Sequence, residues 1–277
     1  MAGCNHDCEN CAQKGSCSEI PKAKLNDRSS IKHVVCVLSG KGGVGKSFVT
    51  SSLAVALNKK GYSVGILDAD VTGPSIPKSF GIHEHAYGED SLVYPVISKT
   101  GIKIMSANLL LDDENQPIIW RGPVLSNLVK QFYEDVLWED LDYLLIDMPP
   151  GTGDVALTIF QMIPVDDLVI VTSPQDLVSL IVSKAIKMAE LMKIHVLGVL
   201  ENMSYLKCPK CGEHISLFGE SKLEEFSKNM GFDILGRLPL DSNNTKKVDE
   251  GKVELIELEE LNPLVDILER RIAKWTN

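Results

Sequence analysis

The sequence predicts an α/β fold in which helices cover both faces of a mostly parallel sheet. Short apolar runs such as HVVCVL and DLVIVT alternate with longer segments compatible with helices. A glycine-rich loop joins one such run to a helical segment, and aspartates end two other runs. Because ligands bind at the carboxyl ends of parallel strands, this arrangement places the chemistry of the chain at one edge of the sheet.

The loop SGKGGVGKS, from Ser39 to Ser47, has the P-loop spacing of Gly, four residues and Gly-Lys-Ser. It lies between HVVCVL and FVTSSLAVALNKKG, so a chance turn is disfavoured. Glycines without Cβ atoms let phosphates approach backbone N–H groups, and the helix N-terminus attracts an anion. We expect Lys46 to hold the outer phosphates and Ser47 to ligate Mg2+. The predicted nucleotide-binding residues of this loop are Gly40, Lys41, Gly42, Gly43, Val44, Gly45, Lys46, Ser47 and Phe48.

Two later segments bring acidic residues to strand ends. YSVGILDAD ends in Asp68 and Asp70, and LDYLLIDMPPGTGD carries Asp147 before a Pro-Gly turn. We expect Asp147 to hold Mg2+ through water and Asp70 to position the attacking water. Asp68 either joins the Mg2+ shell or caps the next turn. Gly151 frees the backbone to approach the γ-phosphate and to respond to its loss.

The other elements follow in order along the chain. TGPSIPKSFG predicts a turn and a short helix, and residues 83–100 predict a loop or small hairpin. Further strands are expected in KIMSANLLL, DLVIVTSPQD, IHVLGVLENMS and DILGRLPL, and further helices over 124–138, 177–192, GESKLEEFSKNMG and 263–275. Asn202 ends one of these strands. Its amide can read the donor and acceptor of an adenine edge, or it can form an Asx turn.

Six of the seven cysteines fall in two clusters, which in a reducing cytosol indicates metal or redox sites. Residues 1–28 have little apolar periodicity and predict a metal-binding arm, with PKAKLNDRSS as a linker to an ATPase domain at 29–277. The arm suits an iron-sulfur cluster or a four-thiolate zinc site, or is a disordered tail with incidental cysteines. Cys36, among valines, is expected to be a small buried side chain. The arm cysteines are Cys4, Cys8, Cys11 and Cys17.

A second cysteine site is predicted in segment 205–218, where CPKCG forms a knuckle that aims Cys208 and Cys211 at one point. Two thiolates are half of the four ligands that a zinc ion or a cubane cluster needs. Since no second CxxC lies nearby, we expect the same knuckle of a twofold-related subunit to complete the site. His214 is an alternative third ligand or a surface histidine.

Composition limits the partners. The net charge of −10 disfavours nucleic acid or an anionic membrane surface as the main partner. Because no leader-like apolar region or spanning run is present, we expect a soluble cytoplasmic protein. The last helix is basic and amphipathic, with Leu264, Ile267, Leu268, Ile272 and Trp275 on one side. We expect it to pack on the sheet rather than to anchor the chain to a membrane.

Lys41 makes the loop a KGGxGK[ST] variant, in which the chain resembles the deviant P-loop ATPases of the MinD, ParA and nitrogenase iron protein families. In those families this lysine reaches the nucleotide of the partner subunit. The strings SGKGGVGKS, DADVTGPSIP, WRGP, DMPPGTGD, ENMS and CPKCG together resemble the Mrp family of iron-sulfur cluster carrier ATPases. That resemblance implies a homodimer with slow ATP hydrolysis and a labile [4Fe-4S] cluster bridged by Cys208 and Cys211 for delivery to apo-proteins. In related folds the turn after Pro239 lies beside the nucleobase.

The arm resembles the scaffold branch of that family, where four cysteines bind a second cluster. The spacing from Cys4 to Cys8 is much shorter than in the family, so the ligand set and the choice between cluster and zinc stay open. Two other functions compete with a cluster carrier. One is a positioning ATPase that binds membrane or DNA, for which the basic last helix is the support. The other is a dimer whose cysteines hold structural zinc.

Overall fold

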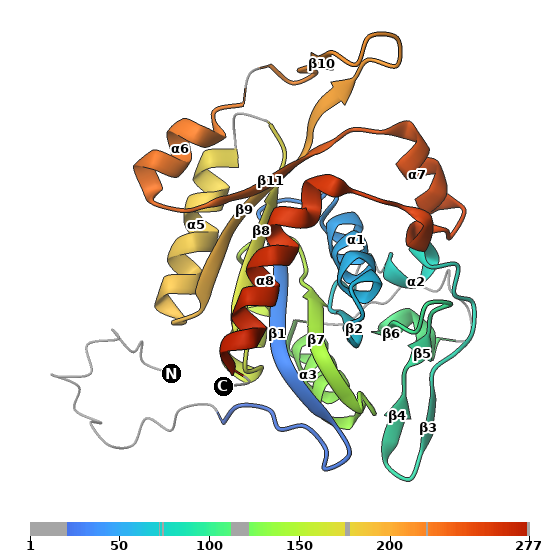
Figure 1. The fold of residues 1–277 in the computed structure, drawn as a ribbon. Helices are drawn as coiled ribbons and strands as arrows, with labels where there is room; N and C mark the ends of the chain where they lie inside the picture. The colour runs from blue at the N-terminus through green and yellow to red at the C-terminus, as the bar shows by residue number, and fades with distance from the viewer. Residues whose placement is uncertain are drawn as a thin grey trace, which may run out of the picture.

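The computed structural model describes residues 21–71, 73, 75–111, 122–174, 178–219 and 221–275, and places one nine-stranded sheet at its centre (Figure 1). Its strands run in the order β10-β9-β8-β1-β7-β2-β6-β5, and β11 pairs with β9. The strands of this sheet are β1 Ser30–Ser39, β2 Val64–Asp68, β5 Val96–Ile97, β6 Lys103–Ser106, β7 Asp140–Asp147, β8 Asp167–Thr172, β9 His195–Lys207, β10 His214–Ile215 and β11 Ile234–Pro239. Only β5 and β10 pair antiparallel among them, so the prediction of a mostly parallel sheet is confirmed.

Helices cover both faces of this sheet. They are α1 Lys46–Lys59, α2 Ile76–Ser79, α3 Gly122–Asp135, α4 Asp154–Met162, α5 Val178–Leu191, α6 Leu223–Met230, α7 Ser242–Asp249 and α8 Asn262–Trp275. Helices α1 and α8 lie together on one face, and α3 packs on α4 while α5 packs on β8 and β9 on the other (Figure 1). The central strands are mostly apolar because helices take both faces away from water, and their buried polar residues, such as His33 and Asp167, lie near strand ends or pair with one another.

The register of the central strands sets the position of the candidate site. Val37 of β1 pairs with Asp147 of β7, and Asp147 pairs in turn with Asp68 of β2. Strands β2 and β7 therefore end at the same level, and β1 continues two residues further, to Ser39. The P-loop follows β1 directly and α1 begins at Lys46, so the loop lies over both aspartates.

Two elements differ from the sequence-based expectations. Strand β9 continues to Lys207 and carries the CPKCG turn beyond the sheet as a hairpin with β10, at the top of Figure 1. Helix α7 was not predicted, since SNNTKKVD has no buried residue and hence no apolar period. The signal that could have found it is Asp241, whose side chain caps the helix by accepting from the Asn243 N–H at 2.8 Å. The predicted hairpin within 83–100 exists as β3 Tyr87–Glu89 and β4 Leu92–Tyr94.

The expected linker PKAKLNDRSS is corrected by the structure, which ties this stretch to the body. Lys22 Nζ donates to the carbonyls of Phe160 and Ile163, and the Ala23 N–H donates to the Met162 carbonyl at 2.7 Å. Asn26 Nδ2 donates to two further backbone carbonyls at 2.9 Å each. Although residues 21–30 have the composition of a linker, hydrogen bonds to backbone carbonyls of the body hold them in place.

The last helix packs on the sheet as predicted. Leu264 and Leu268 are fully buried, Ile272 is 7% exposed, and Ile267 packs against the same core, while the side chain of Trp275 lies outside the described residues. Arg271 on the same helix pairs through Nε with the buried Asp167 carboxylate. The apolar face of α8 is therefore buried against the core of the protein. A search of the described helices finds none long and apolar enough to cross a membrane.

Replacing Leu268 by Ala should lower the free energy of unfolding by about 2 to 5 kcal/mol, because the side chain is fully buried and a cavity would remain. Leu191→Ala is the matched control, since Leu191 is 79% exposed. Urea unfolding followed by circular dichroism measures both. Equal loss in the two variants would contradict the packing of α8 on the sheet.

Candidate functional site

The site is organised around the Asp147 carboxylate at the end of β7, which is fully buried. Ser47 Oγ donates to its Oδ2 at 2.6 Å, and Lys46 Nζ lies 2.8 Å from the same oxygen. Thr50 Oγ1 donates to Oδ1 at 2.7 Å. All three partners come from the first five residues of α1, so the structure brings the P-loop and the strand-end acid together as predicted.

Two further carboxylates from the end of β2 face the same lysine. Asp70 Oδ2 lies 3.6 Å from Lys46 Nζ, and Asp68 is fully buried and accepts from the Asp70 N–H and the Ser106 hydroxyl. Burial raises the pKa of Asp68 well above its ordinary value, Asp147 raises it further, and Lys46 opposes both effects. One ammonium thus pairs with two carboxylates and acts electrostatically on a third. Hydroxyl and carboxylate oxygens are the ligands that Mg2+ prefers.

Glycines of the loop are required by close packing as well as by backbone geometry. Gly45 has a φ of 79°, and a Cβ there would lie 2.2 Å from Asn202 Nδ2. A Cβ at Gly40 would lie 1.7 Å from Ile181 of α5. Gly42 and Gly43 have open space where a Cβ would stand, within the part of the chain that the structure describes. The open side of the loop is therefore at Gly42 and Gly43, and Gly40 is constrained by helix packing.

A small hollow beside the loop contains the residues expected at a nucleobase. It has a volume of about 140 Å³ and is lined by Gly45, Phe48, Asn202, Pro239 and residues of α7. Asn202 is 2% exposed and its Nδ2 donates to the Val44 carbonyl at 2.9 Å, so its Oδ1 is the atom left over. That buried oxygen has no hydrogen-bond partner among the described residues. Asn202, one of the residues that line this hollow, thus has a side-chain acceptor without a partner among the described residues.

Gly151 lies in the turn after β7 with a φ of 91°. Its N–H donates to the Ser39 carbonyl at the end of β1 at 2.7 Å. In this conformation the Gly151 N–H already donates to β1, although we expected the backbone here to approach the γ-phosphate. A phosphate can take this donor only if the turn moves.

The CxxC turn is an exposed knuckle at the tip of the β9–β10 hairpin. The Cys208 N–H donates to the Glu213 carbonyl at 2.8 Å, and the Gly212 N–H donates to the Cys208 carbonyl at 2.9 Å. Hydrogen bonds from the backbone of Cys211 and Lys210, with the Cys211 thiol, lower the pKa of Cys208. The thiolate is the form that binds metals. Cys208 and Cys211 are both free thiols here.

The other sulfur and histidine candidates separate clearly. His214 stacks on Tyr205 with ring centroids 3.9 Å apart, which favours the surface-histidine interpretation over a third ligand. Cys36 is fully buried, as predicted. Cys4, Cys8, Cys11 and Cys17 lie outside the described residues, as do Trp120 and Arg121 of the WRGP string. Over the described ranges, no group of three or more His, Cys, Asp or Glu side chains could hold a metal ion.

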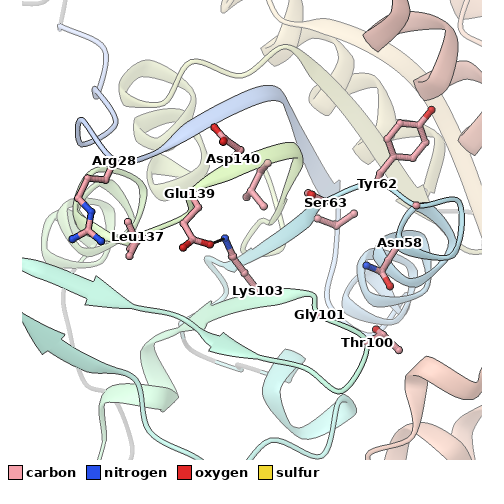
Figure 2. Close-up of a pocket in the computed structure, with 13 residues that line it drawn as sticks. Arg28, Asn58, Tyr62, Ser63, Thr100, Gly101, Lys103, Leu137, Glu139 and Asp140 are labelled. Carbon is pink, nitrogen blue, oxygen red and sulfur yellow. Dashed lines mark hydrogen bonds and ion pairs between the residues drawn. The ribbon is translucent and has the colours of Figure 1, made fainter.

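A larger hollow, of about 790 Å³, lies at the opposite end of the sheet (Figure 2). It is lined by Val64, Lys103 and Asp140, where β2, β6 and β7 begin. Lys103 in this hollow is already paired with Glu139, as Figure 2 shows. The amino ends of parallel strands are the edge that ligands of such sheets do not use. We therefore place the functional site at the P-loop edge.

The fold and the contacts at Asp147 define a P-loop NTPase. Residues 30–273 match the family model described as ParA, NUBPL iron-transfer P-loop NTPase, and the chain belongs to this family. The predictions of the P-loop fold, of an ATPase and of membership in the cluster-carrier group of this class are confirmed.

Known proteins with similar sequences agree with this assignment. An iron-sulfur cluster carrier protein of Clostridium perfringens is 45% identical over 270 residues, which are 94% of this chain and 94% of that protein. A nucleotide-binding protein of Archaeoglobus fulgidus, solved in complex with ADP and with cobalt, is 44% identical with a TM-score of 0.75, over 83% of this chain and 90% of that one. The cell division ATPase MinD of Pyrococcus furiosus is 19% identical with a TM-score of 0.62, over 88% and 99%, and shows the fold alone.

Thr50 is the residue of this site that the sequence did not predict. It stands one helical turn after Lys46, so both side chains lie on the same face of α1. We predict that Thr50→Val lowers Mg2+ affinity or ATP turnover about 10- to 100-fold, as loss of a ligand-orienting hydrogen bond typically does. Thr50→Ser keeps the hydroxyl and should stay near wild type. Hydrolysis rates over a Mg2+ titration measure both variants, and identical curves for Val and Ser would refute the role of Thr50.

Proposed function

We propose that this protein is an ATP-dependent carrier of a [4Fe-4S] cluster, which two copies of the chain hold between Cys208 and Cys211 of each. The observation that carries the proposal is a pair of free thiols, Cys211 exposed and Cys208 partly exposed, just beyond the end of the strand that also supplies Asn202 to the small hollow. The name of the Clostridium perfringens relative supports the cargo, and the ADP in the Archaeoglobus fulgidus structure supports the nucleotide.

ATP is the proposed nucleotide because of the chemistry of the hollow beside Phe48. The buried Asn202 Oδ1 is an acceptor, and the exocyclic amine of adenine is a donor that would satisfy it. The phosphates would lie over the open side of the loop at Gly42 and Gly43, within reach of Lys46. Gly151 would exchange the Ser39 carbonyl for the γ-phosphate, so the turn after β7 would differ between nucleotide states.

Mg2+ fits the oxygen atoms gathered at the end of β7. Ser47 and Asp147 would hold it, with Asp68 behind them, and it would neutralise charge that develops on the phosphates. Asp70 would orient the attacking water, and Lys41 of a second copy would approach the nucleotide across the interface. Delivery of a cation in this way is the logic of an arginine finger, which raises rates about 10³- to 10⁵-fold.

A second copy is proposed because each chain offers two free thiols in one turn, Cys211 exposed and Cys208 partly exposed. Four thiolates would complete a cubane site, and a twofold axis would place both knuckles face to face. Ile215, Leu217 and Phe218 next to the knuckle are 43%, 48% and 44% exposed, which provides apolar surface for such a contact. Recipients would be apo iron-sulfur proteins. The N-terminal arm, with Cys4, Cys8, Cys11 and Cys17, remains a proposed second metal site for a cluster or zinc.

Structural zinc at the same knuckles is the competing proposal, because a closed zinc site also takes four thiolates. Air-stable zinc at one ion per two chains, without visible absorbance, would favour it. A positioning ATPase on membrane or DNA has less support, since the apolar face of α8 is buried in the core.

Removal of the knuckle thiols tests the cargo site. In protein whose four arm cysteines are replaced by Ser, we expect Cys208→Ala with Cys211→Ala to abolish iron retained after anaerobic reconstitution with iron and sulfide. Lys210→Ala is the matched control, because it changes the same turn without removing a thiol. Iron content is measured by elemental analysis. Unchanged iron in the double variant would refute the bridging site.

The two loop lysines should differ in effect. Lys46→Ala should weaken nucleotide binding about tenfold or more, because a hydrogen bond to a charged group is worth roughly 1.5 to 3 kcal/mol. Lys41→Ala should leave affinity nearly intact and slow turnover. Calorimetric titration with ADP and steady-state hydrolysis separate the two. An equal loss of affinity in both variants would contradict the role of Lys41 across an interface.

A further inference from the structure

A buried carboxylate lies at the base of the cysteine hairpin and serves neither the phosphate site nor the thiols directly. Glu201 of β9 is 2% exposed. Its Oε2 accepts from Ser204 Oγ at 2.5 Å, and its Oε1 accepts from Ser221 Oγ at 2.6 Å. These two serines bracket the chain that contains both cysteines, so one carboxylate ties the outgoing and returning ends of the hairpin.

The same carboxylate is fixed to the last strand of the sheet. Arg237 Nε of β11 donates to Glu201 Oε2 at 3.3 Å, and its guanidinium also pairs with Glu224 of α6 at 2.5 Å. Ser221 accepts from the Leu223 N–H at the start of α6. A buried carboxylate that lost these partners would be strongly disfavoured. The position of the returning end therefore depends on Glu201.

The residue after Glu201 belongs to the nucleotide pocket. Asn202 holds the Val44 carbonyl of the P-loop, and successive side chains of a strand point to opposite sides. Met203 follows with a φ of 57°, a left-handed conformation that is uncommon for such a residue and is held by its surroundings. Met203 and Pro239, two residues after Arg237, both line the small hollow. Because Glu201 and Asn202 are consecutive residues of β9, a shift of the strand at Asn202 also moves Glu201.

From this arrangement we infer that Glu201 is a positioning residue, which couples nucleotide occupancy to the order of the cysteine hairpin through its hydrogen bonds to Ser204 and Ser221. A nucleobase that binds Asn202 restrains β9 at this residue and therefore also at Glu201, the residue before it. Glu201 passes this restraint to both ends of segment 205–219 through its two serine partners. Bound nucleotide then holds the thiols more firmly in one direction. The inference rests on the nucleotide and cysteine sites of the proposed function.

The test is hydrogen exchange of the full, metal-free chain under reducing conditions, with and without saturating ADP and Mg2+. Peptides from segment 205–219 report the order of the hairpin by mass spectrometry. In the wild type, nucleotide should slow their exchange about fivefold or more, the usual lower range for coupling between two sites. In Ser221→Ala and in Glu201→Gln this ratio should fall to about one while the dissociation constant for ADP stays within about twofold.

Two controls separate positioning from general damage. Ser221→Thr keeps the hydroxyl and should restore the nucleotide effect. Ser216→Ala makes the same change on an exposed serine inside the hairpin and should leave the effect intact. The inference would be overturned if nucleotide left the hydrogen exchange of the hairpin unchanged in the wild type. It would also be overturned if Ser221→Ala showed the same ratio of exchange rates without and with nucleotide as the wild type. Because no iron is present, failure of cluster binding would leave this result readable.

Discussion

A buried carboxylate must be compensated, and the site of this protein follows from how Asp147 is compensated. The strand that carries it lies between β1 and β2, and the Asp147 carboxylate is buried, so its charge is costly unless polar or charged groups compensate it. Lys46, Ser47 and Thr50 meet that requirement from one turn of α1. The loop between β1 and α1 is thereby held over the ends of three strands. The groups that stabilise the apo site are the same groups that a nucleotide and Mg2+ would engage.

Strand β9 gives the protein its second property. It begins among the parallel strands, passes the small hollow beside the P-loop at Asn202 and ends at Lys207, directly before the cysteine knuckle. One continuous strand therefore links the proposed nucleotide site to the thiols. The thiol pair is at least partly exposed, is flanked by apolar side chains and supplies only half of a tetrahedral site. Contact with a second copy would bury the apolar side chains and supply the missing thiolates.

Much of this could be predicted because the signals are local. The P-loop spacing and the aspartates that end apolar runs placed Lys46, Ser47 and Asp147 together before any coordinates, since parallel strands end at one edge. Long-range facts were not predictable. The role of Thr50 depends on how α1 is positioned against the end of β7. The role of Glu201 depends on Ser221, which is twenty residues away in the sequence and is brought next to it only by the fold. Helix α7 has no apolar period, and residues 22–29 are fixed by backbone carbonyls that no pattern encodes.

The central claim is that a complete cargo site exists only between two chains. Native mass spectrometry of anaerobically reconstituted protein, with the four arm cysteines replaced by Ser, tests it most directly. The account predicts one four-iron cluster in a species of two chains, and monomers without iron. A monomer that carries four iron atoms would contradict it.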